Sequence, residues 1–68
     1  MKKFSERLKE LRQEKNLTQK KLASELAVTI PTLSHWECGY QEPNISQLIT
    51  LARFFDVSVD YLIGNTDL

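Results

Sequence analysis

Apolar residues recur at helical spacing in five stretches of the chain. In the first stretch, Phe4, Leu8 and Leu11 stand at i, i+4 and i+7, so they form one stripe along a helix. Further on, Leu33 and Trp36 form the apolar side of a shorter helix. A longer helix near the C-terminus has the apolar positions Ile45, Leu48, Leu51, Ala52 and Phe55. The pattern predicts an all-α fold of five helices, over residues 5–15, 19–26, 30–38, 45–55 and 59–63.

Residues that favour helix ends flank these stretches. The N-terminal candidates carry a side-chain oxygen that can accept a backbone N–H, and they are Ser5, Thr18, Thr29, Asn44 and Ser58. Asn44 and Gln47 are three residues apart, as in a capping box. The C-terminal candidates favour a left-handed backbone, and they are Asn16, Gly39 and Gly64. Pro31 suits the first turn of a helix but disfavours a helical Ile30, so the third helix starts at residue 30 or at residue 31.

The helices expected at 19–26 and 30–38 are joined by a very short corner. Only Ala27, Val28 and Thr29 separate them, and Val28 would fill the corner where the chain reverses. Two short amphipathic helices joined in this way form a helix-turn-helix, whose second helix can enter the major groove of DNA. We therefore expect the rest of the chain to be organised around residues 17–39.

The 68 residues suffice for one small domain, residues 1–68, of which we expect 65–68 to be a frayed tail. Cys38 is the only cysteine, which excludes an internal disulfide and favours a reducing cytoplasm. No apolar run is long enough to span a membrane. The sequence thus predicts a small cytoplasmic domain.

The net charge is zero, but the charges are unevenly distributed along the chain. Residues 1–21 carry a net charge of +5 and residues 22–68 carry a net charge of −5. Such an asymmetry suggests one surface that attracts polyanions and another that does not. The alternative is that the first helix is simply a solvated helix with Glu and Lys pairs at helical spacing.

Candidate catalytic and metal-binding chemistry is sparse. His35 and Cys38 stand at i and i+3, a spacing that two metal ligands can share, but the sequence has no second His or Cys. A single histidine cannot be placed in a catalytic triad from the sequence, and there is no glycine-rich phosphate loop. We therefore predict no enzyme, no metal site and no cofactor.

The order and spacing of several motifs resemble the Cro/CI (Xre-type) family of helix-turn-helix repressors. These motifs are L-T-Q-x-x-L-A-x-x-L-x-V-T, then x-x-x-L-S-x-W-E-x-G, then P-N and V-S-V-D-Y-L-I-G. The resemblance covers residues 4–64 and implies a compact, lambda-repressor-like domain. It implies a transcriptional regulator, acting as a repressor, that binds an inverted repeat in double-stranded DNA as a homodimer. The family usually has glycine where this chain has Ala27, a position that suits a left-handed backbone.

The resemblance also implies which residues contact DNA. The base contacts would come from the outward face of the third helix, from Ile30, Pro31, Thr32, Ser34 and His35. The phosphate contacts would come from Thr18, Gln19, Lys20, Thr29 and Tyr40, together with the N-terminus of the helix at 45–55. Ile30 and Pro31 can only pack on thymine methyl groups, so we expect more apolar contact and shape readout than usual. Ile30 could instead be a core or dimer-contact residue, and His35 a plain surface residue.

Two further expectations concern how the domain is held together. By the same resemblance, Glu37 pairs with Arg12, and because Glu37 stands beside the core residue Trp36 we expect this ion pair to be partly buried. Phe54, Tyr61 and Ile63 are apolar residues in excess of those that so small a core can hold. They would form either a two-fold dimer contact or the remainder of the core.

A protein-interaction module of the same fold is the alternative function, for example an antirepressor or the antitoxin subunit of a complex. The zero net charge, the apolar Ile30 and Pro31, and a loop after Gly39 without Lys or Arg favour it. Glu42 in that loop would repel a phosphate.

Overall fold

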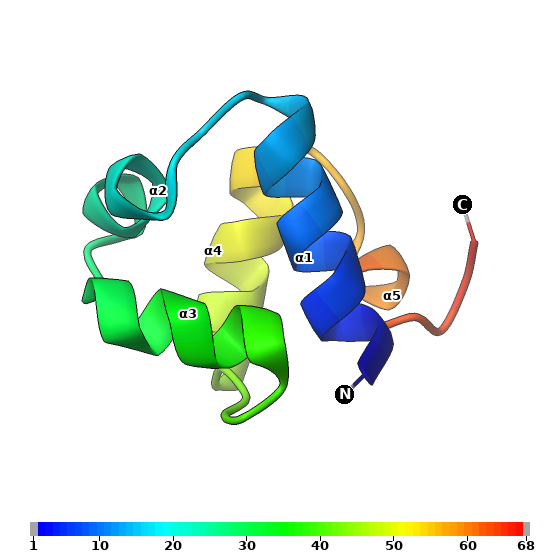
Figure 1. The fold of residues 1–68 in the computed structure, drawn as a ribbon. Helices are drawn as coiled ribbons and strands as arrows, with labels where there is room; N and C mark the ends of the chain where they lie inside the picture. Colours follow the sequence, from blue (N-terminus) through cyan, green and yellow to red (C-terminus); the bar gives the residue numbers. More distant parts are fainter. Residues whose placement is uncertain (1, 68) are drawn as a thin grey trace.

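The computed structural model describes residues 2–67, and the elements in this range are five α-helices (Figure 1). They are α1 (Lys2–Glu14), α2 (Gln19–Leu26), α3 (Ile30–Cys38), α4 (Ile45–Phe55) and α5 (Val59–Leu62). The all-α fold of five helices is confirmed, and the bounds of α2 and α4 are those expected. Of the two possible starts of α3, the structure has Ile30.

The start of α1 was predicted wrongly. The helix begins at Lys2, so Ser5 is a buried residue inside α1 and does not cap its N-terminus. The cause is Phe4, which is fully buried in the core together with Leu8 one turn later. A helical backbone through residue 4 is what brings both side chains to the same face.

The other helix ends follow the capping pattern. The Thr18, Thr29 and Ser58 side chains each accept a hydrogen bond from the backbone N–H three residues on. Asn44 and Gln47 form both hydrogen bonds of a capping box. Left-handed backbone angles end the helices at residues that include Asn16, Ala27 and Gly39. Ala27 has φ 56° and ψ 40°, so the turn of the helix-turn-helix carries a non-glycine residue in the left-handed region.

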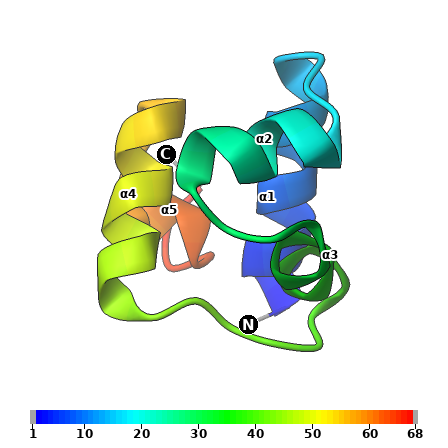
Figure 2. The ribbon, with the colours of Figure 1, turned by 90° about the vertical axis from the view of Figure 1, so that its left-hand side faces the viewer.

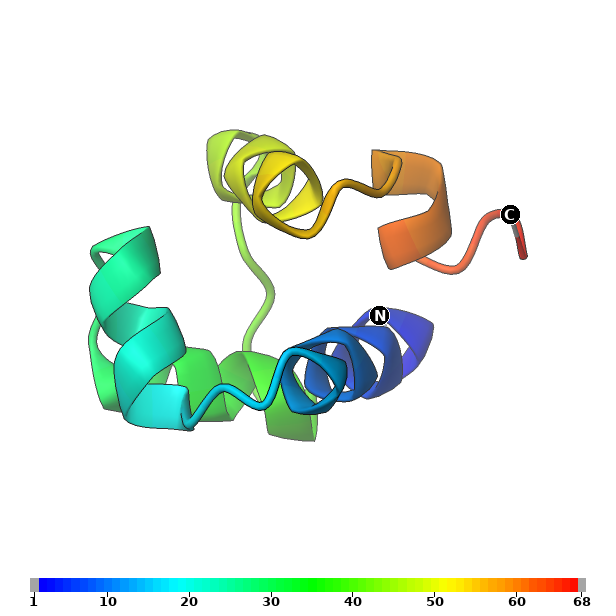
Figure 3. The same ribbon diagram turned by 90° about the horizontal axis from the view of Figure 1, so that it is seen from above.

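The core lies where the helix faces meet. Its buried members are Phe4, Leu8, Leu22, Ala23, Leu33, Trp36, Leu51, Phe55 and Leu62. Seen from above, α1, α2 and α3 form one side of the molecule, and α4 and α5 form the other (Figure 3). Ile45 follows the apolar period of α4 in the sequence, but it is 75% exposed. The buried face of α4 runs through Leu51, Ala52 and Phe55, and Ile45, seven residues before Ala52 on the same face, lies beyond the core.

The surplus apolar residues near the C-terminus are largely covered. Phe54 packs on the core, edge-on to Phe55 with 5.0 Å between the ring centroids. The Tyr61 ring lies under the Arg7 guanidinium, whose Cζ is 4.3 Å from the ring centroid. Phe54, Tyr61 and Ile63 are all half-buried. Of the two expected roles, a dimer contact or the remainder of the core, the second describes Phe54 in particular.

The segment expected to fray lies against α1. Arg7 Nη1 donates to the carbonyl oxygens of Tyr61 and Thr66, and Arg7 Nη2 donates to Asp67 Oδ1 at 2.8 Å. Gly64 has φ 83°, and a Cβ at this residue would lie 2.5 Å from Lys3 Cβ, so the close approach requires glycine. Residues 65–67 are thus attached to α1, while Leu68 lies outside the described residues.

No helix within residues 2–67 combines the length and the apolar character needed to cross a membrane.

Candidate nucleic-acid interface

The outward face of α3 is the surface expected to read DNA. Leu33 and Trp36 are buried and fix the helix on the core. On the opposite side, Ile30 is 44% exposed and Pro31 is exposed, while Thr32, Ser34 and His35 are half-buried. Ile30 is therefore a surface residue and not a core residue.

Cys38 belongs to the same face, although the sequence analysis did not include it in the interface. It is exposed and stands seven residues after Pro31 and four after Ser34, which places the three in one stripe along α3. The helical spacing from Ser34 was the signal that could have identified it. The exposed face of α3 thus extends over the full length of the helix.

The N-terminus of α3 has a fixed arrangement of hydroxyl groups. Thr29 Oγ1 accepts from Thr32 N at 3.2 Å and donates to Thr32 Oγ1 at 2.8 Å. The two hydroxyl groups are thus paired with each other at the start of α3. Pro31 occupies the first turn, where its missing N–H leaves no helical hydrogen bond unmade.

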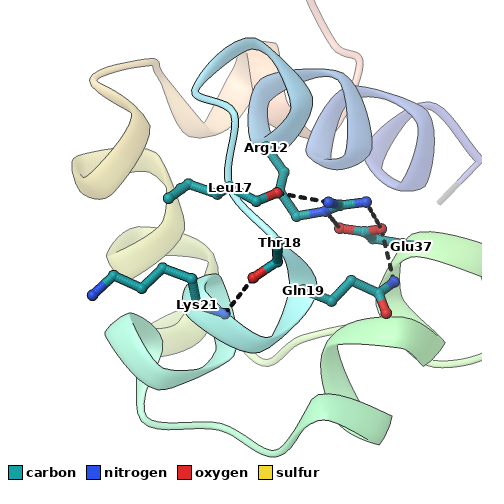
Figure 4. A network of polar contacts seen from close by, with 6 residues as sticks. All are labelled: Arg12, Leu17, Thr18, Gln19, Lys21 and Glu37. Atoms are coloured by element: carbon teal, nitrogen blue, oxygen red, sulfur yellow. Dashed lines mark hydrogen bonds and ion pairs between the residues drawn. The ribbon is translucent and has the colours of Figure 1, made fainter.

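A buried polar network joins α1, α2 and α3 (Figure 4). Arg12 donates from Nε to Glu37 Oε2 at 2.6 Å and from Nη2 to Glu37 Oε1 at 3.1 Å, so the structure contains the expected ion pair in a two-bond form. The side chains are 13% and 4% exposed. Arg12 Nη1 also donates to the Leu17 carbonyl at 2.8 Å. The network fixes α3 against α1 and against the segment that enters α2.

Gln19 is the third side chain on Glu37, and sequence reasoning missed this contact. Its Nε2 donates to Glu37 Oε1 at 3.1 Å, and Figure 4 shows its side-chain oxygen turned away from Glu37. The amide keeps a second N–H, which can still be donated to another acceptor. Glu37 therefore fixes the orientation of the side chain for which a phosphate contact is expected.

The first turn of α2 contains two lysines, of which one forms an ion pair and the other does not. Thr18 Oγ1 accepts from Lys21 N at 3.0 Å and caps the helix. Lys21 Nζ lies 3.2 Å from Glu25 Oε1 in an exposed ion pair one turn apart. Lys20 is exposed, and within residues 2–67 it forms no ion pair. Of the two, Lys20 is the cation available to an anion at the N-terminus of α2.

Tyr40 lies at the other end of the surface, after Gly39 ends α3. It is 77% exposed, and its ring centroid lies 5.1 Å from that of His35 at a tilt of 50°. The Tyr40 N–H donates to the His35 carbonyl at 2.9 Å. His35 is thus not an isolated surface residue, because Tyr40 restricts its ring on one side.

The expected site residues fall into three groups around α3. Thr29, Ile30, Pro31 and Thr32 lie at its N-terminal end. Thr18, Gln19 and Lys20 lie at the N-terminus of α2, which the Gln19–Glu37 hydrogen bond places beside the C-terminal half of α3. His35, in the C-terminal half of α3, and Tyr40, just after the helix, form the third group, and Ser34 lies between this group and the first along the helix. A line of polar and apolar side chains along an exposed helix, flanked by a helix N-terminus, has the form of a major-groove reading surface.

Comparison with known proteins supports this interpretation. A family model described as helix-turn-helix matches residues 8–62. The chain is 42% identical over 65 residues to the transcriptional activator BcrR of Enterococcus faecalis, covering 96% of this chain and 32% of that protein. It is 43% identical over 60 residues to the uncharacterized transcriptional regulator YqaE of Bacillus subtilis, covering 88% of this chain and 52% of that protein. It is 30% identical over 64 residues to the transcriptional repressor RstR, from a cryptic CTXphi phage in Vibrio cholerae, covering 94% of this chain and 58% of that protein.

This chain therefore spans about a third of the activator and just over half of the other two relatives. The shared part is in each case the region that includes the two helices α2 and α3. On the family match, the motifs and the fold, the chain belongs to the helix-turn-helix family of Cro/CI (Xre) type, a family of DNA-binding transcriptional regulators.

Proposed function

We propose that this protein is a sequence-specific DNA-binding regulator, acting as a repressor, in which α3 reads the major groove. The observation that supports this most directly is the exposed face of α3 on a rigidly held helix. The inner side of α3 is buried through Leu33 and Trp36, and the Arg12–Glu37 ion pair joins its C-terminal end to α1. Such rigidity matters because base readout depends on hydrogen bonds with narrow geometry.

Within this proposal, base readout combines polar and apolar contacts. Thr32, Ser34 and His35 offer hydrogen bonds to base edges, and Ile30 and Pro31 offer surface for thymine methyl groups. Cys38 extends the same stripe and joins this set. The weak hydrogen-bonding capacity of the face implies that part of the specificity comes from DNA shape.

The phosphate contacts come from the edges of the surface. Thr18, Gln19 and Lys20 at the N-terminus of α2 serve one DNA strand, since helix N-termini attract phosphates. Thr29 and Tyr40 contribute at the two ends of α3, and the capped N-terminus of α4 supplies further N–H groups. These contacts fix the position of the protein on DNA and do not read sequence.

We further propose that the protein acts as a homodimer on an inverted repeat, in the cytoplasm of a bacterial cell. Half-sites one helical turn apart lie about 34 Å from centre to centre. Ile45 and Ile49 on α4 are 75% and 41% exposed and one turn apart, so they form an apolar strip suited to a two-fold contact. They replace Phe54, Tyr61 and Ile63 as the proposed dimer residues, because those three are largely covered.

Selection from a random duplex pool at moderate salt, followed by sequencing, tests the proposal. The expected result is an enriched inverted repeat, which gives the site and the half-site spacing together. A protein shown to be folded by circular dichroism that enriches no sequence would contradict DNA recognition and point to a protein partner. A steep loss of affinity with salt is expected for the enriched duplex, because phosphate contacts release counterions.

A further inference from the structure

A pocket of about 140 Å³ lies between the helix-turn-helix and α4. Figure 2 shows α4 opposite α2 and the turn that leads into α3; these elements line the pocket together with Trp36 of α3. Leu26, Val28 and Trp36 contribute from the helix-turn-helix, and Leu51 contributes from α4. This part of the lining is apolar, and the pocket is open to solvent on one side.

The rim of the pocket is polar and comes entirely from the first turns of α4. Its members are Asn44, Ser46, Gln47 and Thr50. In the capping box, Asn44 Oδ1 accepts from Gln47 N and Gln47 Oε1 accepts from Asn44 N, both at 2.8 Å. Both side-chain oxygens are therefore used, and the two NH₂ groups make no hydrogen bond within residues 2–67. The rim consequently offers hydrogen-bond donors.

The electrostatic potential at the rim also favours a negatively charged ligand group. The N-terminus of α4 carries the positive end of the helix dipole, and no charged side chain lines the pocket. An apolar cavity of about 150 Å³ accommodates a single benzene ring, so the volume suits one ring. An apolar floor with donors at one edge matches a ring that carries an anionic acceptor.

We propose that this pocket binds a small monocyclic aromatic carboxylate and that the ligand acts as an effector of DNA binding. The ring occupies the space between Leu26, Val28 and Leu51, and the carboxylate faces the NH₂ groups of Asn44 and Gln47. A bound ligand contacts both the helix-turn-helix and the N-terminus of α4. It therefore weakens DNA binding, because it competes with a phosphate for the same N-terminus and fixes the separation of α3 from α4. This second step rests on the proposed DNA-binding function.

Sodium benzoate is the probe, and binding is measured by titrating the ¹⁵N-labelled full chain while recording amide shifts. We expect saturable shifts confined to the lining residues, with a dissociation constant on the order of 1 mM for a ligand of so few atoms. Sodium acetate lacks the ring and benzyl alcohol lacks the charge, so each should bind at least about threefold more weakly. Absence of saturable shifts, or equal binding of either comparison compound, overturns the proposed ligand class.

Two variants of α4 locate the site. Thr50→Phe fills the pocket and should abolish the benzoate shifts, whereas Arg53→Phe adds the same ring at an exposed residue outside the lining and should bind benzoate as the natural chain does. Circular dichroism and thermal melting establish that both variants fold. If Thr50→Phe is unfolded, the residues that shift in the natural chain still decide, because shifts outside the lining contradict the site.

The effect on DNA is measured separately, by fluorescence anisotropy of the enriched duplex with benzoate or with sodium chloride at equal ionic strength. We expect a loss of DNA affinity of at least threefold at saturating benzoate, absent in Thr50→Phe. Unchanged affinity with benzoate bound overturns the effector role. If the protein binds no duplex at all, the proposed function fails while the amide shifts still decide whether the pocket binds benzoate.

Discussion

Glu37 is the residue on which the polar contacts behind α3 converge. It accepts hydrogen bonds from Arg12 and from Gln19, and its side chain is only 4% exposed. A carboxylate buried to this degree requires a counter-charge and further hydrogen-bond donors; Arg12 of α1 supplies the charge, and Gln19 of α2 donates an additional hydrogen bond. The same residue thus stabilises the fold and orients a side chain proposed to contact DNA.

Removing Glu37 should be far more costly than removing an exposed acid. Glu37→Ala leaves Arg12 buried without its partner, so the free energy of unfolding should fall by about 3–5 kcal/mol. Glu25→Ala, which breaks the exposed pair with Lys21, is the matched control and should cost no more than about 0.5 kcal/mol. Urea denaturation followed by circular dichroism measures both. A loss for Glu37→Ala as small as that of the control would show that the pair contributes nothing to stability.

Ala27 carries local strain that glycine should relieve. Its φ of 56° lies in the left-handed region, where a Cβ costs about 1–2 kcal/mol. Ala27→Gly should therefore raise the free energy of unfolding, by about 0.5–1 kcal/mol after the larger entropy loss of glycine. Ser24→Gly, in the interior of the helix α2 that Ala27 ends, should lower the free energy of unfolding by a similar amount. Thermal and urea unfolding of the two variants compare the signs, and a loss for Ala27→Gly would refute the strain.

At the scale of elements, Arg7 connects α1 to the end of the chain. Its guanidinium donates hydrogen bonds to the carbonyl oxygens of Tyr61 and Thr66 and stacks on the Tyr61 ring. These contacts stabilise the C-terminal end of α5, which is too short to be a stable helix alone. Arg7→Ala should lower the free energy of unfolding by about 1.5–3 kcal/mol, the range for hydrogen bonds to a charged group.

The effect of Arg7→Ala should be local as well as global. Amide hydrogen exchange should show the largest loss of protection at residues 62–65, which lie between the two bonded carbonyls, those of Tyr61 and Thr66. Lys9→Ala removes an exposed cation from the same helix and should change neither protection nor stability appreciably. Unchanged exchange at residues 62–65 in Arg7→Ala would mean that the tail is held by other contacts.

Local patterns predicted the elements well because the deciding interactions are local. The caps Thr18, Thr29 and Ser58 bond groups three residues away, so the sequence identifies them directly. The start of α1 could not be predicted in this way, because it depends on the burial of Phe4 against distant helices. The tail could not be predicted either, since the contacts of Arg7 span 54–60 residues of sequence.

The candidate site shows the same division. The outward face of α3 follows from helical spacing, and the exposure of Ile30 and Pro31 agrees with it. The contact between Gln19 and Glu37 joins two helices whose relative position the spacing does not give. Ile45 continues the apolar period of α4 in sequence but lies beyond the core in space, because a period gives the direction of a side chain and not the extent of the neighbouring surface.

At the scale of the whole molecule, Lys20 is the one lysine or arginine among the residues proposed to contact DNA. The loop after α3 contains no Lys or Arg, and Lys21 is paired with Glu25. Lys20→Ala should therefore weaken binding to the enriched duplex and reduce the slope of log K against log salt by about 1 per bound protomer. Lys21→Ala should reduce this slope less, because Lys21 must break its ion pair with Glu25 before it can contact a phosphate. Fluorescence anisotropy over a salt series measures both, and equal slopes for Lys20→Ala and the natural chain would remove Lys20 from the phosphate contacts.

The proposed dimer is formed through the apolar strip of Ile45 and Ile49. Dimerisation matters for affinity because two domains with little net charge bind DNA more tightly when they are joined than when each binds alone. Ile45→Asp places an acid in the first turn of α4, where the helix dipole favours it, so the fold should be retained. Ser46→Asp adds the same charge at the next residue and keeps Ile45. Sedimentation velocity should show dimers for the natural chain and for Ser46→Asp, and monomers for Ile45→Asp. On the inverted repeat, Ile45→Asp should lose at least about tenfold more affinity than Ser46→Asp, whereas on a single half-site the two should bind alike. Equal affinity of the two variants on the full repeat would exclude the α4 strip as the two-fold contact.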